Sequence, residues 1–184
     1  MRFIRTTHEQ VVQKVQNLIQ LQQEAFVYCV AEAPCAVVGT NGHADIEKAA
    51  ELGIKVIRIN HEGGCIVTNT GDVDVGIFTK GYYGHQIRDT IISKLVTLLS
   101  ADGIEAAIMG NDLIVEGHKV LGFGSRMYGE ILYTAMHISI NTNLELIRQI
   151  CTKPMEKIPG SLSEYGITAE DVVNILMETI KMYE

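Results

Sequence analysis

"GNDLIVEGHKVLGFGSR", residues 110–126, is the stretch of sequence that decides the fold. Asn111 and Asp112 precede a short apolar run, a Gly-His pair interrupts it, and Lys119 opens a second apolar run in which glycine recurs. Apolar runs separated by turn residues predict two strands joined by a tight turn, with a lysine at the start of the second strand. Taken alone, such a lysine most often faces solvent, and an Asn-Asp pair most often only makes a turn.

A second segment, "VIRINHEGGCIVTNTGDVDVG" at residues 56–76, carries the adjacent glycines Gly63 and Gly64. It predicts two strands that meet at a hairpin corner on this glycine pair. A tight turn needs one glycine, whereas two leave a longer stretch of backbone bare, so that it can lie against a ligand. The strand that follows, "DVDVGIF", alternates with a period of two residues, which predicts one polar or ligand-facing side.

Hydrophobic periodicity predicts helices around these strands. Thr7 and Gln10 have the spacing of a capping box at the start of the first helix. In the second helix, Ile46, Ala49 and Ala50 are expected to face inward. The expected helices cover residues 7–24, 44–53, 86–100, 143–151 and 169–183. The expected strands cover residues 25–32, 34–39, 54–59, 65–69, 72–78, 106–109, 112–117, 119–126 and 130–141.

Strands joined by short turns, with helices between and after them, predict an α+β fold with a mixed, mostly antiparallel central sheet flanked by helices. The 184 residues contain no internal repeat, low-complexity tract or linker, which predicts one domain over residues 1–184. Hydrophobic residues make up 47% of the chain and charged residues 20%, enough apolar side chains for a buried core.

Charge and apolar run length narrow the class of partner. The net charge of −7 disfavours nucleic acid, whose backbone attracts basic surfaces. The apolar runs are far shorter than the roughly 20 residues that a membrane span needs. The N-terminus is amphipathic and does not resemble a signal peptide, and the four cysteines include no CxxC pair. These features predict a cytoplasmic protein with reduced thiols.

Several familiar site motifs are missing from the sequence. It has no GxxxxGK[ST] phosphate loop and no GxGxxG between a strand and a helix. The histidines and cysteines form no HxxxH or CxxC cluster of the kind that binds zinc. No GxSxG elbow is present for a serine nucleophile. The two glycine-containing segments are therefore the remaining candidates for a functional site.

Together and in this order, the two segments resemble the catalytic domain of the biotin/lipoate protein ligase family, and more closely its lipoate-protein ligase A branch. "RINHEGGCIVTNTG" follows the length of the family's Arg-Arg-x-Ser-Gly-Gly-Gly-Ala-Val-x-His-x-x-Gly motif. "NDLIVEGHKVLG" matches Asn-Asp-Leu-x-Val-x-Gly-x-Lys-Ile-x-Gly at nearly every position. "VVGTNG", "ISINTNLE" and "GSLSEYGI" are similar to further family segments, so the resemblance extends from about residue 12 to the end.

The resemblance implies an enzyme that uses ATP to convert lipoate or octanoate to an acyl-adenylate and then transfers the acyl group to a lysine. Lys119 takes the place of the family's essential lysine, where an ammonium group would stabilise negative charge that builds at the α-phosphate. Asp112 is implied as a ligand of Mg²⁺, which prefers carboxylate and phosphate oxygens. The implied substrate- and nucleotide-binding residues are Arg58, Gly63, Gly64, Cys65, Ile66, Val67, Asn111 and Gly122.

The implied acceptors are the lipoyl domains of 2-oxoacid dehydrogenase complexes or the H protein of glycine cleavage. Many ligases of this branch carry a C-terminal accessory domain, and none is expected within residues 1–184. A separate accessory chain is therefore a possible further partner, whereas neither nucleic acid nor a membrane is expected.

The first motif departs from the family pattern at several positions, and the departures leave three alternatives open. Ile59, His61, Glu62 and Thr68 replace an arginine, a serine, a glycine and a histidine. A chain with these changes could be a binding module that keeps Lys119 but has lost turnover. The other members of the family are octanoyltransferases and biotin ligases.

An octanoyltransferase would use a cysteine nucleophile, and Cys151 is the nearest candidate. It lies about four residues early, and the transferase Pro-Cys-Gly falls on "PME", which has no nucleophile. Biotin ligases carry a Lys-Trp-Pro-Asn-Asp segment, whereas this chain contains no tryptophan. A lipoate-protein ligase is therefore the first hypothesis for the function, and an octanoyltransferase is the second.

Overall fold

The computed structural model describes residues 1–59, 63–153 and 155–183. A seven-stranded sheet forms its centre, and every neighbouring pair in this sheet is antiparallel except β1 and β2. The predicted mixed, mostly antiparallel sheet is confirmed. In spatial order its strands are β1 (Arg2–Arg5), β2 (Ala25–Val30), β6 (Val73–Lys80), β10 (Ile131–Ile138), β9 (His118–Tyr128), β8 (Asp112–Val115) and β7 (Ala106–Met109).

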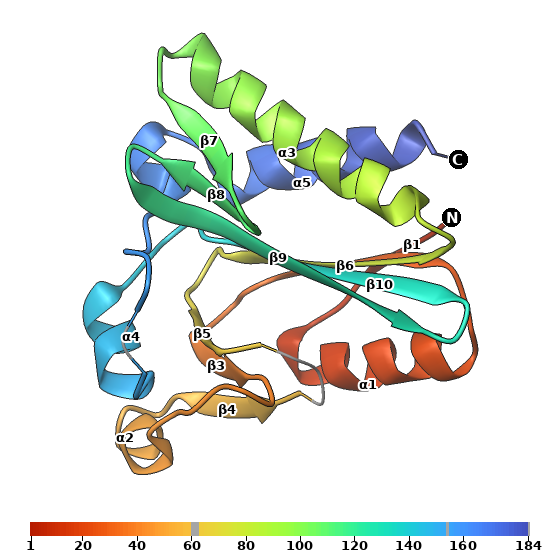
Figure 1. Ribbon diagram of the computed structural model, residues 1–184. Helices are drawn as coiled ribbons and strands as arrows, with labels where there is room; N and C mark the ends of the chain where they lie inside the picture. Colours follow the sequence, from red (N-terminus) through yellow and green to blue (C-terminus); the bar gives the residue numbers. More distant parts are fainter. Residues whose placement is uncertain (60–62, 154, 184) are drawn as a thin grey trace.

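A smaller sheet of three strands lies below the large one in Figure 1. Its strands are β4 (Lys55–Arg58), β3 (Cys35–Val38) and β5 (Cys65–Thr68), in this spatial order. β3 occupies the middle, parallel to β4 and antiparallel to β5. The predicted hairpin between β4 and β5 is therefore wrong, because both strands pair with β3 and not with each other.

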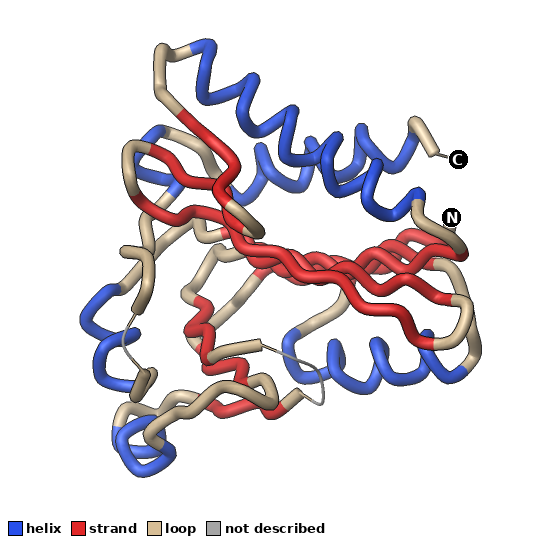
Figure 2. The backbone as a smooth tube through the Cα atoms, viewed as in Figure 1, coloured by secondary structure: helices blue, strands red, loops and turns tan. Residues whose placement is uncertain are grey.

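The helices lie on both faces of the large sheet (Figure 1). Helices α3 and α5 cover one face, and α1 and the small sheet cover the other. Figure 2 shows the large sheet as a twisted layer between them. The helices are α1 (His8–Gln20), α2 (Ile46–Glu51), α3 (Tyr83–Ala101), α4 (Leu144–Ile150) and α5 (Ala169–Lys181), with a short 3₁₀ helix η1 at Leu162–Tyr165.

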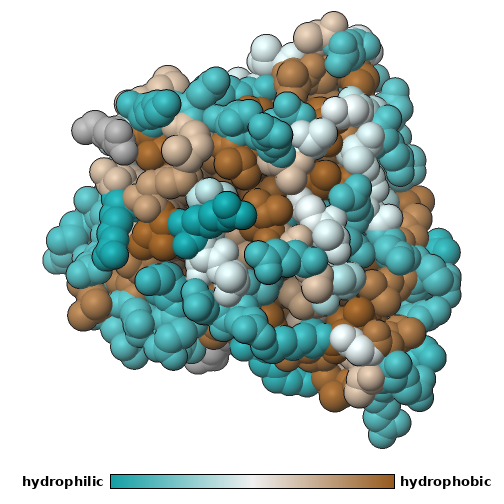
Figure 3. All heavy atoms as spheres, turned by 180° about the vertical axis from the view of Figure 1, so that it is seen from behind, coloured by the Kyte–Doolittle hydropathy of each residue, from teal (hydrophilic) through white to brown (hydrophobic). Residues whose placement is uncertain are grey.

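The main core fills the space between the large sheet and helices α3 and α5. Its side chains are those that helical or strand periodicity places on the inward face, as in Ile87, Ile91 and Leu95 of α3, all fully buried. A second cluster lies under α1, around Leu18 and Phe78. Seen from behind, the surface mixes hydrophobic and hydrophilic residues (Figure 3). In the described part of the chain, no helix is long and apolar enough to span a membrane.

Some local predictions differ from the structure. Thr7 is the N-cap of α1, but its side chain makes no capping hydrogen bond, whereas Thr168 and Asp171 form a capping box at the start of α5. In α2, Ala49 is buried, but Ile46 is 46% exposed and Ala50 is exposed. A helix of six residues has too few turns to present a wide buried face. Strand β1 was not predicted, because four residues carry little periodicity.

The glycine corner, Gly63-Gly64, packs against the loop after β3 by backbone contacts. The Gly39 amide donates a hydrogen bond to the Gly64 carbonyl oxygen at 2.9 Å, and the Asn41 amide donates to the Gly63 carbonyl oxygen at 3.2 Å. A Cβ atom at Gly42 would come within 2.3 Å of the Gly64 carbonyl oxygen. This close approach requires glycine on the β3 side of the contact.

We therefore expect Gly42→Ala to destabilise the fold by roughly 1–3 kcal/mol, the usual cost of forcing an extra methyl group into packed structure. Gly64→Ala is the matched control, because a Cβ atom there meets no described atom within 4 Å. Urea denaturation of both variants measures the difference. Equal stability of Gly42→Ala and wild type would show that the corner is not held by this contact.

Candidate active site

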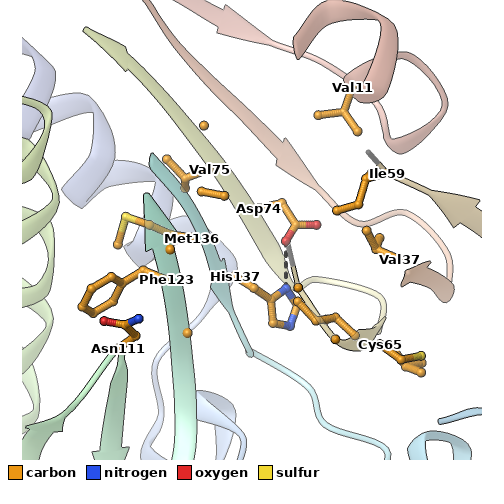
Figure 4. A pocket seen from close by; sticks show the side chains of 18 of the residues that line it. Val11, Val37, Ile59, Cys65, Asp74, Val75, Asn111, Phe123, Met136 and His137 are labelled. Atoms are coloured by element: carbon orange, nitrogen blue, oxygen red, sulfur yellow. Dashed lines mark hydrogen bonds and ion pairs between the residues drawn. The ribbon is translucent and has the colours of Figure 1, made fainter. Parts of the chain in front are cut away.

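A cavity of about 1290 Å³ lies between the large sheet, helix α1 and the small sheet. Its floor is the lower face of strands β6, β10 and β9, and its opposite wall contains the glycine corner and β5. Figure 4 shows Asp74 and His137 turned toward each other in this cavity, with Val11 and Ile59 on the other side. The cavity thus brings together residues from nearly the whole length of the chain.

A row of paired residues crosses the cavity floor from strand to strand. Cys29 pairs with Asp74, Asp74 with His137, His137 with Gly122, and Gly122 with Asp112. Residues directly opposite one another on neighbouring strands point to the same face of a sheet. Five strands therefore present these positions to one side, although 83 residues separate the first from the last in sequence (29 to 112).

A β-bulge brings Lys119 to the same side as Gly122. Leu113 of β8 pairs with Leu121, but the next residue, Ile114, pairs with Lys119, so that β9 contains one extra residue, Val120. A bulge of this kind reverses the alternation of side chains and can redirect one of them. The backbone of Lys119 is held in place by residues 158–160, whose Ile158 oxygen accepts its amide at 2.8 Å.

Asp112 forms ion pairs with two lysines at one end of the row. Lys119 Nζ lies 2.7 Å from its Oδ1, and Lys157 Nζ lies 2.6 Å from its Oδ2. Burial alone would raise the pKa of Asp112, but the two ammonium groups outweigh burial and lower it. A Cβ atom at Gly122 would lie only 2.9 Å from Lys119 Nζ, so glycine at this position lets the lysine extend across the strand.

Asp74 holds two histidines at the other end of the row. His8 Nε2 donates to Asp74 Oδ2 at 2.6 Å, and His137 Nδ1 donates to Oδ1 at 2.8 Å. Burial alone would lower the pKa of both histidines, but hydrogen bonds and charge from Asp74 outweigh it. With a contribution from Cys29, they raise the pKa of His8 to about 11. They also raise the pKa of His137 above its usual value. Burial would raise the pKa of Asp74, but the two imidazolium groups hold it well below its usual range.

Cys29 lies next to this cluster but is not placed as a nucleophile. Its Sγ is 3.2 Å from His8 Nδ1, which together with Asp74 has the order of a Cys-His-Asp triad. The residue is only 1% exposed, and it is not among the residues that line the cavity. The thiol therefore contacts the His8 ring without lining the cavity.

Most of the sequence-predicted site residues line the cavity. Arg58 lies on β4 with its side chain exposed and does not line it, whereas the neighbouring Ile59 does. His61 and Glu62 are outside the described residues. The predicted residues that line the cavity are Gly63, Gly64, Cys65, Ile66, Val67, Asn111, Asp112, Lys119 and Gly122.

The donor set around Asp112 does not fit a magnesium site in this arrangement. Both carboxylate oxygens are paired with ammonium groups, which compete with a cation for the same lone pairs. Within the described residues, no group of three or more potential metal ligands comes together. A metal-binding role for Asp112 stays a prediction that this geometry does not support.

Sequence reasoning missed His8, His137 and Lys157. No spacing motif connects them to each other or to Lys119, because they come from α1, β10 and the segment after α4. The one available signal was the alternation in "DVDVGIF", which predicted a polar side for β6 and thereby indicated Asp74.

Cys65 and Cys151 both line the cavity and contact each other. Cys151 Sγ donates to the Cys65 carbonyl oxygen at 3.4 Å and also lies within hydrogen-bond reach of its thiol. That thiol contact lowers the pKa of Cys65 in spite of burial, and the same contact together with burial raises the pKa of Cys151. A thiol with a raised pKa is a poor nucleophile at neutral pH, because the reactive form is the thiolate.

We expect iodoacetamide at neutral pH to modify Cys65 before Cys151. Cys29 and Cys35, which are 1% and 4% exposed, should react last. Mass spectrometry of peptides after timed quenching measures the order. Faster modification of Cys151 would contradict the assigned direction of the thiol contact and favour Cys151 as a nucleophile.

The Asp74 cluster should make stability depend on pH in a defined window. A histidine whose folded pKa is raised stabilises the fold fully below its ordinary value of 6.5, and this stability is lost as the pH rises toward the folded value, about 11 for His8. Asp74, whose folded pKa is lowered, stabilises the fold above its ordinary value of 3.8 and loses this effect as the pH falls.

We therefore expect the urea concentration at the unfolding midpoint of the wild type to decrease as the pH is raised from 6.5 to 10. In Asp74→Asn this decrease should be smaller. Asp89→Asn is the control, because that carboxylate is 60% exposed and, among the described residues, forms an ion pair with the neighbouring Arg88 alone. An equal slope in wild type and Asp74→Asn would show that Asp74 does not hold the histidines in their charged form.

Comparisons with known proteins agree on the family and the fold. A family model for the lipoyl protein ligase A/B catalytic domain matches residues 7–182. No curated protein matches the sequence. Among solved structures, LipL1 of P. falciparum in complex with lipoate has a TM-score of 0.76 at 16% identity, covering 99% of this chain and 62% of that one.

Two further structures are as similar in fold. One is a bi-partite lipoate protein ligase from Thermoplasma acidophilum, solved in a study of an archaeal lipoylation system that includes its E2 lipoyl domain. Its TM-score is 0.78 at 13% identity, covering 98% of this chain and 82% of that one. The other is a lipoate-protein ligase A bound with ATP, with a TM-score of 0.78, 13% identity and coverage of 98% and 84%. The resemblance of the two sequence motifs is confirmed: this chain belongs to the lipoyl protein ligase A/B catalytic domain family.

Proposed function

We propose that this chain is a lipoate-protein ligase, which uses ATP to activate lipoate or octanoate and transfers the acyl group to a lysine of a lipoyl domain. The observation that carries this proposal is the position of Lys119. Its ammonium group lies over Gly122 on the floor of the same cavity whose opposite wall contains the bare backbone of Gly63 and Gly64. An acyl-adenylate bound here would lie between the lysine and this glycine corner.

The chemistry explains why a lysine is needed at this position. In the first step a carboxylate oxygen of the acid bonds to the α-phosphorus of ATP, the bond to the β-phosphate oxygen breaks, and pyrophosphate leaves. Two anions must approach each other, and negative charge builds on the phosphate oxygens, so that a fixed ammonium group lowers the barrier. In the second step the amine nitrogen of the acceptor lysine bonds to the acyl carbon and loses a proton, while the bond from the acyl carbon to the phosphate oxygen breaks and AMP leaves with its electron pair.

Lys157 would allow Lys119 to turn from Asp112 to an anionic ligand. In the structure Asp112 holds both lysines, one on each carboxylate oxygen. When Lys119 turns toward an anionic ligand, Lys157 still neutralises Asp112, and its Nζ also donates to the Met109 carbonyl oxygen at 2.9 Å. The 15% exposed Asp112 would thus not be left as an unpaired charge, which is costly in a partly buried site.

The rest of the cavity suits the hydrocarbon chain of a medium-length acid. Helix α1 presents an apolar stripe to it, and β2, β6 and β10 add small or aromatic side chains. Burying a chain of this kind is favourable by roughly 0.8 kcal/mol per CH₂ group. The apolar lining residues on this side are Val11, Val12, Val15, Ile19, Val27, Tyr133 and Ala135.

The known structures support the choice of substrates and acceptor. LipL1 of P. falciparum was solved with lipoate, a lipoate-protein ligase A with ATP, and the T. acidophilum ligase in a study that includes its E2 lipoyl domain. We infer that this chain acts on the same classes of molecule, with ATP as cosubstrate. The H protein of glycine cleavage as acceptor, Mg²⁺ as cofactor and a separate accessory chain stay predictions.

Octanoyl transfer through Cys151 is the second candidate, because this thiol also lines the cavity. Its raised pKa disfavours the thiolate that transfer would need. A thioester trapped on Cys151 after incubation with octanoyl-carrier protein would favour the transferase over the ligase. A protein that binds the acid but neither releases pyrophosphate nor forms this thioester would be a binding module.

We expect Lys119→Ala to lower acyl-adenylate formation by roughly 10²–10³-fold, the usual loss when one transition-state donor is removed. Lys119→Arg should rescue poorly, because a planar guanidinium does not replace a compact ammonium group in a narrow slot. His118→Ala is the control and should be nearly silent, since His118 is exposed and does not line the cavity. Pyrophosphate release and mass spectrometry of a lipoyl domain measure these effects. Wild-type rates in Lys119→Ala would remove the lysine from the mechanism.

A further inference from the structure

The cavity floor has a positively charged group on each side of Gly122. His137 is the direct cross-strand partner of Gly122, and the end of the Lys119 side chain lies over Gly122 from the other side. The charge of Lys119 acts on His137, where it opposes the rise in pKa that Asp74 causes. Two cations therefore face each other across a position that has no side chain of its own.

Each of these two cations is bound to a carboxylate. Asp74 is bound to His137 Nδ1. Asp112 Oδ1 is bound to Lys119 Nζ and lies 3.3 Å from where a Cβ atom at Gly122 would be, so Lys119 must turn from Asp112 toward a ligand placed there. His137 Nε2 makes no hydrogen bond with another described residue, and the nearest carboxylate oxygen, of Asp72, is 3.9 Å away. Asp72 is 1% exposed, and its oxygens accept backbone amides of residues 69, 140 and 141.

Positive groups outnumber carboxylates along the row. The cations are His8, His137, Lys119 and Lys157, and the carboxylates are Asp72, Asp74 and Asp112. Four positive groups thus meet three carboxylates in and beside the row, and Arg126 of β9 adds a further cation to the described lining of the cavity. Charges that are partly removed from solvent are stable when they are paired, so an excess of cations favours an anionic ligand.

We propose that a carboxylate binds over Gly122 between His137 and Lys119, and that Asp74 and His8 hold His137 charged to receive it. The substrate is then a monocarboxylic acid whose apolar tail lies along the apolar stripe of α1. His137 becomes a binding residue for the acid, and Asp74 and His8 become positioning residues that act through it. This inference rests on the proposed function, because it assumes that the cavity takes an acid.

Hydrogen bonding explains why an imidazolium suits this place. His137 Nδ1 is fixed on Asp74, which orients the ring and leaves the Nε2–H group as the donor for a ligand. A carboxylate held between this donor and an ammonium group forms two charge-assisted hydrogen bonds. Bound there, it would be oriented next to Lys119, where the α-phosphate must arrive.

The charged groups that face His137 determine the pH at which it loses its proton. These are Asp74 and Asp72 from the β6 side, Lys119 from β9 and, through Asp74, His8 from α1. His137 keeps its proton at neutral pH, because its pKa is raised. Affinity for a carboxylate should decline as the pH rises through the pKa of His137, whereas affinity for a neutral ligand of the same shape should not change.

The test is calorimetry with octanoate and its neutral analogue octanamide, without ATP or an acceptor. His137→Gln keeps a hydrogen-bonding side chain but removes the charge, and it should weaken octanoate binding by about 10- to 100-fold, the range for losing a hydrogen bond to a charged group. Octanamide should bind wild type and His137→Gln equally. His8→Gln should weaken octanoate less, and His118→Gln, outside the cavity, should change neither ligand.

The outcomes separate this site from the proposed ligase activity. Equal loss of octanoate and octanamide in His137→Gln would show that the histidine only shapes the cavity, and unchanged octanoate binding would show that it does not contact the acid; either result overturns the proposal. Octanoate binding that depends on His137, without pyrophosphate release in wild type, would support the carboxylate site and reject the ligase.

A measurement on wild-type protein covers the case in which His137→Gln does not fold. Nitrogen-15 NMR of the histidine side chains should show octanoate, and not octanamide, shifting the His137 Nε2 signal and raising its pKa. The same small change with both ligands would overturn the proposal.

Discussion

The pairing register of β6, β10, β9 and β8 is the constraint on which the candidate site depends. It aligns Asp74, His137, Gly122 and Asp112 in one row across the cavity floor. A slip of one residue in a strand moves each of its side chains to the other face of the sheet. In β10 such a slip would bury His137 and expose Met136 and Ile138, which are 3% and 0% exposed in the core. The hydrophobic core on the α3 and α5 side therefore fixes the polar row on the opposite side.

The β-bulge at Val120 is the one irregularity that this register contains, and the position of Lys119 depends on it. Regular alternation would place Lys119 on the face opposite to Gly122, inside the core, where an ammonium group has no partner. The extra residue instead places Val120 in the core, fully buried, and turns Lys119 toward Asp112. Core packing and the lysine's charge thus favour the same backbone conformation. Residues 158–160 pair with the Lys119 backbone and keep the bulge in place.

Pairing of charges links the two ends of the row. Asp74 is held by two histidines and Asp112 by two lysines, so each of these two carboxylates is bound on both oxygens. Cations surrounding shared carboxylates can turn to a ligand without leaving an unpaired charge behind. The glycine corner on the opposite wall adds no side chain and offers only backbone. The cavity therefore combines a charged floor, a bare wall and an apolar stripe along α1, which is the combination that an acid with a long apolar tail requires.

The sequence by itself determined the fold class, most helices and strands and the family, because these depend on local periodicity and on motifs within about fifteen residues. It also predicted a role for Lys119. It could not determine that β3 separates β4 from β5, since strand order depends on long-range pairing. Nor could it unite His8, Asp74 and His137, which lie on three separate elements and have no common motif. Only the tertiary structure brought them together, because cross-strand register and the packing of α1 set which distant side chains share a face, and a bulge of one residue decided on which face Lys119 lies.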